Sequence, residues 1–186
     1  MFLPHQYFDD LDVMMIYRLD RFGRGGHHRP FNDVGFPAVR IMETHEHYDR
    51  QHQDLRTEDG VMYGDVLSGV NFDYARKVTA LNVVTLASLA AAPAPPSGVL
   101  IEGQVSPDTT LQWQRVSGAA GYRVHWRLTT EAQWTHSRWV GDVDAATLEN
   151  VVIDNYLFGV SSVSEAGFSS PVVFPGPIGS FKTDEY

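Results

Sequence analysis

The stretch from Leu89 to Gly98, LAAAPAPPSG, divides the chain into two parts with different hydrophobic patterns. Its prolines and alanines favour an extended, semi-rigid conformation, which predicts the end of a helix and then a linker over residues 93–98. Upstream, apolar residues between Phe72 and Ala91 recur at steps of three and four, as in an amphipathic helix. Downstream, they alternate with polar residues, as in short strands. We expect domains over residues 1–92 and 99–176 and a tail over 177–186.

The second half contains four alternating segments, Thr109–Val116, Gly121–Leu128, His136–Gly141 and Asn155–Ser164, which are separated by turn residues. This spacing predicts an all-β antiparallel sandwich. The details resemble a fibronectin type III domain: a tryptophan on the second strand, GYRVHWR on the third and YLFGVSSVS on the penultimate strand. The resemblance implies a tyrosine corner, in which a phenol reaches back to the backbone. The residues concerned are Trp113 in the core, Tyr156 at the corner, and Trp126, Trp134 and Trp139, which either pack internally or form an exposed row for a sugar or peptide ligand.

The first half contains both helix-like and strand-like hydrophobic patterns. We expect a core strand over Val13–Leu19, a short helix near Arg29–Val34, a strand over Ala38–Met42, and then the long helix. These elements make up only half of an α/β layer, which would leave a sheet edge and an apolar face without partners.

A cluster of histidines lies between Arg24 and Asp54. Neutral imidazoles and carboxylates are ligands of divalent zinc, and loops at strand ends commonly carry them. The alternative is a solvated polar loop, because no spacing here matches a closed zinc site. The residues concerned are His27, His28, His45, His47 and His52, with Glu43, Glu46, Asp49 and Asp54.

Three blocks in this region, GRGGHHRPF (23–31), GFPAVRI (35–41, with Glu43 following) and YDRQHQD (48–54), carry a family resemblance. Their order and short gaps resemble the C-terminal part of the catalytic domain in the di-zinc aminopeptidase superfamily, which includes bacterial secreted aminopeptidases and relatives of glutamate carboxypeptidase and the transferrin receptor. The resemblance implies a partial three-layer α/β sheet and zinc-dependent hydrolysis of peptides with a free N-terminus. It also implies two zinc ions in the complete enzyme and an extracellular or periplasmic location.

The resemblance assigns roles to individual residues. His52 is the expected zinc ligand, because Arg50, in a slot where relatives often have histidine, cannot bind a metal. Asp54 would orient an imidazole from the second coordination shell. His28 matches the histidine of the family's Gly-Gly-Asp-His step, and His27 replaces its aspartate. Glu43 would line the substrate side of the cleft or be solvated, with His45 and His47.

Other family motifs are missing. The 26 residues before His27 contain no His-x-Asp motif and no Glu-Glu pair, so no catalytic residue is assigned. We expect a C-terminal fragment of a longer enzyme, with Met1 an internal or miscalled start, that binds zinc weakly or not at all and is inactive by itself. The alternative is a non-enzymatic interaction protein that uses its β-sandwich and keeps a degenerate peptidase half.

Composition excludes several classes of protein. A net charge of −9 argues against nucleic acid as a partner, since its backbone demands clustered lysine and arginine. No apolar run approaches the roughly 20 residues of a membrane-spanning helix, and no signal peptide is visible. The absence of cysteine excludes disulfides and thiolate-bound zinc.

Overall fold

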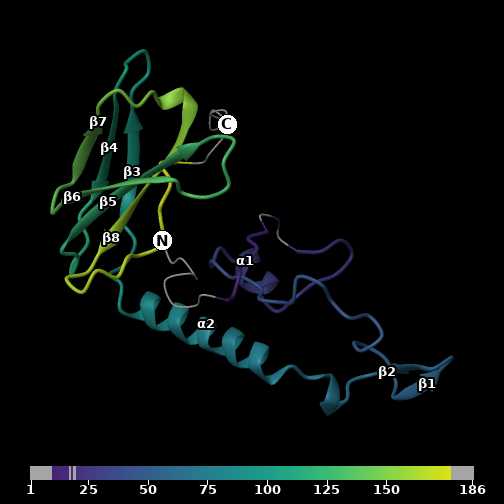
Figure 1. Ribbon diagram of the computed structural model, residues 1–186. Coiled ribbons are helices and arrows are strands. Elements are labelled where there is room, and N and C mark those ends of the chain that lie inside the picture. The colour runs from purple at the N-terminus through teal and green to yellow at the C-terminus, as the bar shows by residue number, and fades with distance from the viewer. Residues whose placement is uncertain (1–9, 17, 19, 177–186) are drawn as a thin grey trace. The chain divides into compact units, whose positions relative to one another are not determined.

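The computed structural model describes residues 10–16, 18 and 20–176, which form two compact units, residues 10–79 and 80–176 (Figure 1). No helix within these residues is long and apolar enough to span a membrane.

The C-terminal unit contains two antiparallel three-stranded sheets (Figure 1). One sheet has the strand order β3-β4-β7 and the other β6-β5-β8. A last segment lies beside β8 through isolated bridges from Val160 to Val173 and from Val163 to Ser169. The strands are β3 (Ser97–Glu102), β4 (Thr109–Gln114), β5 (Gly121–Leu128), β6 (His136–Gly141), β7 (Ala145–Leu148) and β8 (Tyr156–Val163), with the 3-10 helix η3 (Ile153–Asn155) before β8.

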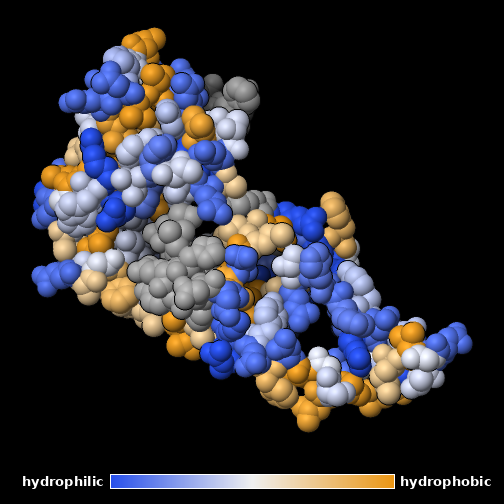
Figure 2. Space-filling model, in the orientation of Figure 1, coloured by the Kyte–Doolittle hydropathy of each residue, from blue (hydrophilic) through white to orange (hydrophobic). Residues whose placement is uncertain are grey.

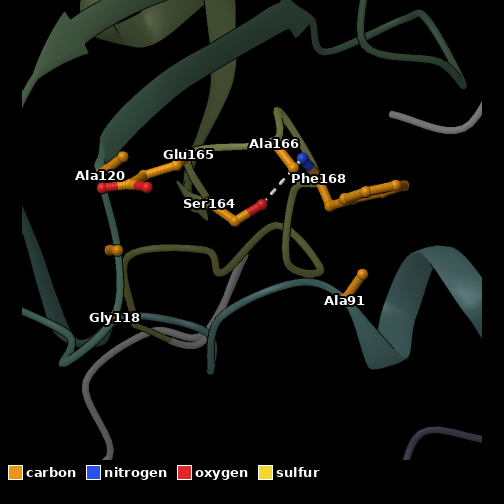
Figure 3. A pocket seen from close by; sticks show the side chains of 8 residues that line it. Ala91, Gly118, Ala120, Ser164, Glu165, Ala166 and Phe168 are labelled. Atoms are coloured by element: carbon orange, nitrogen blue, oxygen red, sulfur yellow. Dashed lines mark hydrogen bonds between the residues drawn. The ribbon is translucent and has the colours of Figure 1, made fainter.

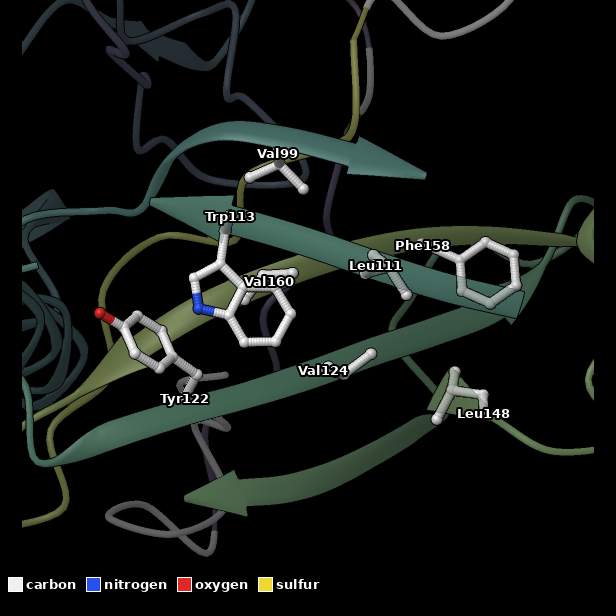
Figure 4. Packing of buried hydrophobic residues seen from close by; sticks show 8 residues of the cluster. All are labelled: Val99, Leu111, Trp113, Tyr122, Val124, Leu148, Phe158 and Val160. Carbon is white, nitrogen blue, oxygen red and sulfur yellow. The ribbon is translucent and has the colours of Figure 1, made fainter. Parts of the chain in front are cut away.

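The two sheets enclose one hydrophobic core (Figure 4). In β4, Leu111 and Trp113 are buried while their neighbours point outward, as the alternation of side chains along a strand requires. The Trp113 ring lies 5.3 Å from that of Tyr122, whose phenolic oxygen accepts a hydrogen bond from the Val116 backbone N–H. The cluster consists of Val99, Leu111, Trp113, Tyr122, Val124, Leu148, Phe158 and Val160. This core confirms the predicted antiparallel sandwich.

Four strands of this unit lie where the sequence predicts them. β5 and β6 have the predicted bounds, and β4 and β8 lie within theirs, whereas β3 and β7 were not expected. The Tyr156 hydroxyl makes no hydrogen bond to any residue that the structure describes; its ring packs edge-on against Phe158 instead. The contact of a tyrosine corner is therefore not formed. Before β3, the Ala94 carbonyl accepts a hydrogen bond of 2.6 Å from the Ser162 hydroxyl.

The N-terminal unit has little regular structure. It contains α1 (Arg29–Asp33), a hairpin of β1 (Arg56–Glu58) and β2 (Val61–Tyr63), and the 3-10 helix η2 (Leu67–Gly69). The long helix α2 (Phe72–Ala90) crosses the division between the units. The predicted positions of both α-helices are confirmed. The hairpin was not expected, although its Asp-Gly turn, with φ of 50° and 80°, has the backbone that favours this dipeptide.

The two strands predicted in the first half are not present. Residues 13–16, 18 and 38–42 have no strand structure, and Tyr17 and Leu19 lie outside the described residues. A strand needs a neighbour for its backbone hydrogen bonds, and the described part of the chain offers none to these segments. The expected partial three-layer α/β sheet is therefore not formed by these residues.

The apolar side chains of this unit remain largely exposed (Figure 2). Between residues 10 and 79, Leu11 is the only buried hydrophobic residue among those described, while eighteen large hydrophobic residues are exposed. Phe22 is 90% exposed and Val39, in the predicted strand, is 80% exposed. The described residues of this unit thus form no hydrophobic core of the kind that stabilises the sandwich.

Candidate functional site

His52 lies at the end of a turn that the neighbouring hairpin holds in place. The Arg50 N–H donates to the His47 carbonyl at 3.0 Å, and the Gly64 N–H, just after β2, donates to the Asp49 carbonyl at 2.8 Å. His52 has a φ of 56°, in the left-handed region that few residues other than glycine adopt, and its side chain is exposed. Its imidazole is accessible to a metal ion or another ligand.

A network of charged groups fixes the start of this turn. The Glu46 carboxylate accepts hydrogen bonds from Arg21 at 3.0 Å and from Arg24 at 2.7 Å, and Arg24 also donates to the Gln51 side chain at 3.2 Å. The hydrogen bond from Arg24 holds the pKa of Glu46 below its usual value. Arg21 and Arg24 were not predicted from the sequence, because their partners lie 22 to 27 residues away and no short-range pattern reveals such a pairing.

His28 belongs to the same region. Its Nε2 lies 3.7 Å from Oδ2 of Asp20, and only 7% of the His28 side chain is exposed. The Arg21 backbone N–H donates to the other Asp20 oxygen at 2.7 Å and lowers the pKa of Asp20. The substituted Gly-Gly-His-His step therefore places a histidine against a carboxylate. His27, the neighbouring candidate, is exposed.

Glu43 lines a pocket of about 570 Å³ in the N-terminal unit. Its carboxylates outnumber its one ammonium group, that of Lys77, which bonds to Asp10 at 2.5 Å and lowers the pKa of that carboxyl. At the same place the Asn71 side chain accepts a hydrogen bond from the Tyr74 N–H and caps α2. The lining residues are Asp10, Leu11, Asp12, Glu43, Thr44, His45, Asn71, Asp73, Tyr74 and Lys77. The pocket thus has a surplus of negative charge.

The described residues do not form a metal site by themselves. Within residues 10–16, 18 and 20–176, no three histidine, aspartate or glutamate side chains come close enough together to hold a metal ion. Asp54 is exposed, as is His52. Nη1 of Arg50 is buried and has no hydrogen-bond partner among the described residues. The residues present therefore do not fit a complete zinc centre.

A second pocket, of about 510 Å³, lies at one end of the sandwich (Figure 3). Small side chains line most of it, together with Phe168 and one carboxylate, Glu165. The Ser164 hydroxyl oxygen accepts a hydrogen bond from the Phe168 N–H at 3.1 Å. This pocket offers no pairing of an acid with a base or a nucleophile.

The sequence is similar to fungal proteins named as probable zinc metalloproteases. One from Leptosphaeria maculans is 46% identical over 170 residues, which cover 90% of this chain and 39% of the relative. One from Pyrenophora teres is 42% identical over 170 residues, covering 90% of this chain and 35% of the relative. The chain thus spans somewhat over a third of the length of these relatives.

No family model matches the sequence. Among solved structures, a fibronectin type III-like protein from Clostridium thermocellum aligns with a TM-score of 0.38 at 25% identity, covering 44% of this chain and 85% of that protein.

Proposed function

We propose that this chain is the C-terminal portion of a zinc-dependent exopeptidase of the aminopeptidase type. The observation that carries the proposal is the 46% identity to a probable zinc metalloprotease, which extends over 90% of the chain and hence through both units. The exposed apolar residues of the N-terminal unit support it, since side chains such as Val39 and Phe22 are 80% and 90% exposed and could be covered by a further part of the enzyme. The substrate would be a peptide with a free N-terminus, and the location extracellular or periplasmic.

The role proposed for this chain is to contribute one ligand and part of the pocket wall. His52 is exposed and held by its turn, and residues outside this chain would complete the zinc centre. In enzymes of this kind zinc activates a water molecule and polarises a carbonyl group. The chain's own residues would do the positioning: Arg24 holds the start of the His52 turn through Glu46 and Gln51. Glu43 lies in a pocket whose negative charge suits the ammonium group of a peptide.

By this proposal the 186-residue chain alone is inactive. With aminoacyl-nitroanilide substrates and zinc, it should give rates no higher than buffer with zinc. Co-expression with the part of the Leptosphaeria maculans relative that lies outside the matched region should restore zinc-dependent turnover. His52→Ala should then abolish turnover, and His47→Ala, in an exposed histidine of the same turn, should leave most of it.

Three results would count against this assignment. Turnover by the bare chain that survives repurification would refute the fragment proposal. A restored enzyme that depends on His47 but not on His52 would refute the ligand assignment. Calorimetry that shows a stoichiometric submicromolar zinc site in the bare chain, lost on His52→Ala, would show that the histidine cluster binds metal without further residues, since tight structural sites need about four converging ligands.

A second function, binding through the sandwich without catalysis, is favoured by one observation. The sandwich has a continuous buried core and so does not need the N-terminal unit for its apolar contacts. This function would be favoured if the His52→Ala chain bound a sugar or peptide ligand as tightly as the parent chain does and showed no turnover under any condition above.

A further inference from the structure

The β6-β5-β8 sheet has an unusual distribution of charge. Residues 97–176 contain four arginines, no lysine and eight carboxylates, yet three of the arginines and none of the carboxylates lie in these three strands. The sheet therefore carries a positive charge within a chain whose net charge is −9. Such segregation creates a local field that favours an anionic partner.

Two of these arginines, Arg123 and Arg127, lie on the outer face of the sheet. Because Tyr122 and Val124 point into the core, the alternate residues of β5 face the other way. Nη1 of Arg123 donates to the Ser137 hydroxyl at 3.4 Å, a long hydrogen bond between neutral and charged groups. Neither guanidinium forms an ion pair with any carboxylate in the described part of the chain. Among the described residues, no carboxylate therefore neutralises their charge by an ion pair.

Two tryptophans lie on the same face: Trp139 is the cross-strand partner of Arg123, and Trp134 packs on His125, between the two arginines. A Cβ atom added to Gly121 would lie 2.5 Å from Cη2 of Trp139, so the end of the indole ring rests directly on the backbone of β5. Trp139 remains 46% exposed. Further along, the Trp134 ring packs 5.9 Å from His125, and the Arg127 guanidinium lies 5.4 Å from the ring centroid. We call Arg123, Arg127, Trp134 and Trp139 the arginine–tryptophan face.

We propose that the arginine–tryptophan face binds an extended acidic peptide segment of a partner protein. Guanidinium groups bind carboxylates with paired hydrogen bonds, and the tryptophans supply apolar area to the rest of the segment. Arg123 and Arg127 are four residues apart on one strand, about 13 Å at the rise of a β-strand. His125 lies between them and is covered by Trp134, so a peptide that runs extended in the direction of β5 crosses the Trp134 ring. It presents two carboxylates at this spacing when acidic residues occur four positions apart.

The test measures binding of a synthetic peptide to the full 186-residue chain. The probe is a fluorescein-labelled, C-terminally amidated octapeptide with glutamate at positions two and six and threonine elsewhere, followed by fluorescence anisotropy. The comparison peptide has glutamine at both positions. The test variant is Arg123→Gln with Arg127→Gln. The matched control is Arg115→Gln, because Arg115 is an exposed arginine of the same unit that already pairs with Asp142 at 3.1 Å.

The proposal expects the glutamate peptide to bind at least tenfold more tightly than the glutamine peptide. The double variant should weaken binding at least fivefold with an unchanged melting temperature, while the Arg115 variant binds as the parent does. Raising the salt concentration should weaken binding, since the charges are near the surface. Equal binding of both peptides, no binding at millimolar chain concentration, or full binding by a folded double variant would each overturn the proposal. So would self-association that the double substitution abolishes, because the occupant would then be a second copy of the chain.

Discussion

Lowering the pH from 7.5 to 5 should destabilise the sandwich through one buried histidine. His125 is 2% exposed, and its Nε2 lies 2.9 Å from the Ser161 hydroxyl oxygen. Burial, with a contribution from the positive charge of Arg123, lowers the pKa of His125 from 6.5 to about 4. The unfolded chain therefore binds a proton at His125 between pH 6.5 and 4 that the folded chain does not bind, and folding stability falls as the pH falls through this window.

The size of the effect follows from the two pKa values. Proton linkage between 6.5 unfolded and about 4 folded lowers the free energy of unfolding by about 2 kcal/mol at pH 5 and about 3 kcal/mol at pH 4, relative to pH 7.5. The assay is urea unfolding followed by tryptophan fluorescence. All four tryptophans lie between residues 113 and 139, so the signal reports the sandwich.

The decisive comparison is the variant His125→Gln. Glutamine does not titrate in this range and can bring an amide near the position of Nε2. Between pH 6.5 and 4, the free energy of unfolding of His125→Gln should therefore fall much less than that of the parent. The control His136→Gln, at the exposed histidine of β6, should show the same fall as the parent. The same pH dependence in the parent and in His125→Gln, with both proteins folded at pH 7.5, would refute the reasoning.

Two further predictions concern stability. Leu111→Ala, at a fully buried side chain of β4, should lower the free energy of unfolding by about 3 kcal/mol, whereas Leu100→Ala, 61% exposed on the neighbouring strand, should change it by less than about 0.5 kcal/mol; equal losses in urea melts would contradict the core described above. Limited trypsin digestion should degrade the N-terminal unit and leave a resistant fragment that begins downstream of Arg56 and retains the sandwich strands; a fragment of comparable resistance that ends before Phe72, seen by mass spectrometry, would show that the N-terminal unit is stable by itself.

The sandwich could largely be predicted from the sequence because its strands bury one face each. The alternation in GYRVHWRL and HSRWVG reflects a real inside and outside, and β5 and β6 have the predicted bounds. β7, with the sequence AATL, was not predicted because a segment of four residues is too short to show a clear alternation.

The first half could be predicted less well for the opposite reason. The apolar run over Ala38–Met42 indicates a buried strand, but burial and pairing depend on neighbours that the described residues do not provide. The helix α2 was predictable since its hydrogen bonds are internal to the segment. The candidate site also depends on contacts that local sequence patterns do not reveal. The turn that holds His52 depends on the hairpin β1-β2, and the Glu46 network joins residues more than twenty positions apart. The roles predicted for His52, His28, Glu43 and Asp54 stay predictions.

The lack of a hydrophobic core among the described residues of the N-terminal unit has a consequence for sequence variation. If every position were randomised and the chain selected only for folding, Leu111 or Tyr122 would tolerate few replacements, while Phe22 or Val39 would accept almost any residue, polar ones included. In natural sequences, selection for function can also preserve residues that folding of the unit does not require. If an apolar residue is retained at Val39, its retention would indicate a contact with a partner outside this unit. The pattern of variation across this region can therefore locate the surface that such a contact covers.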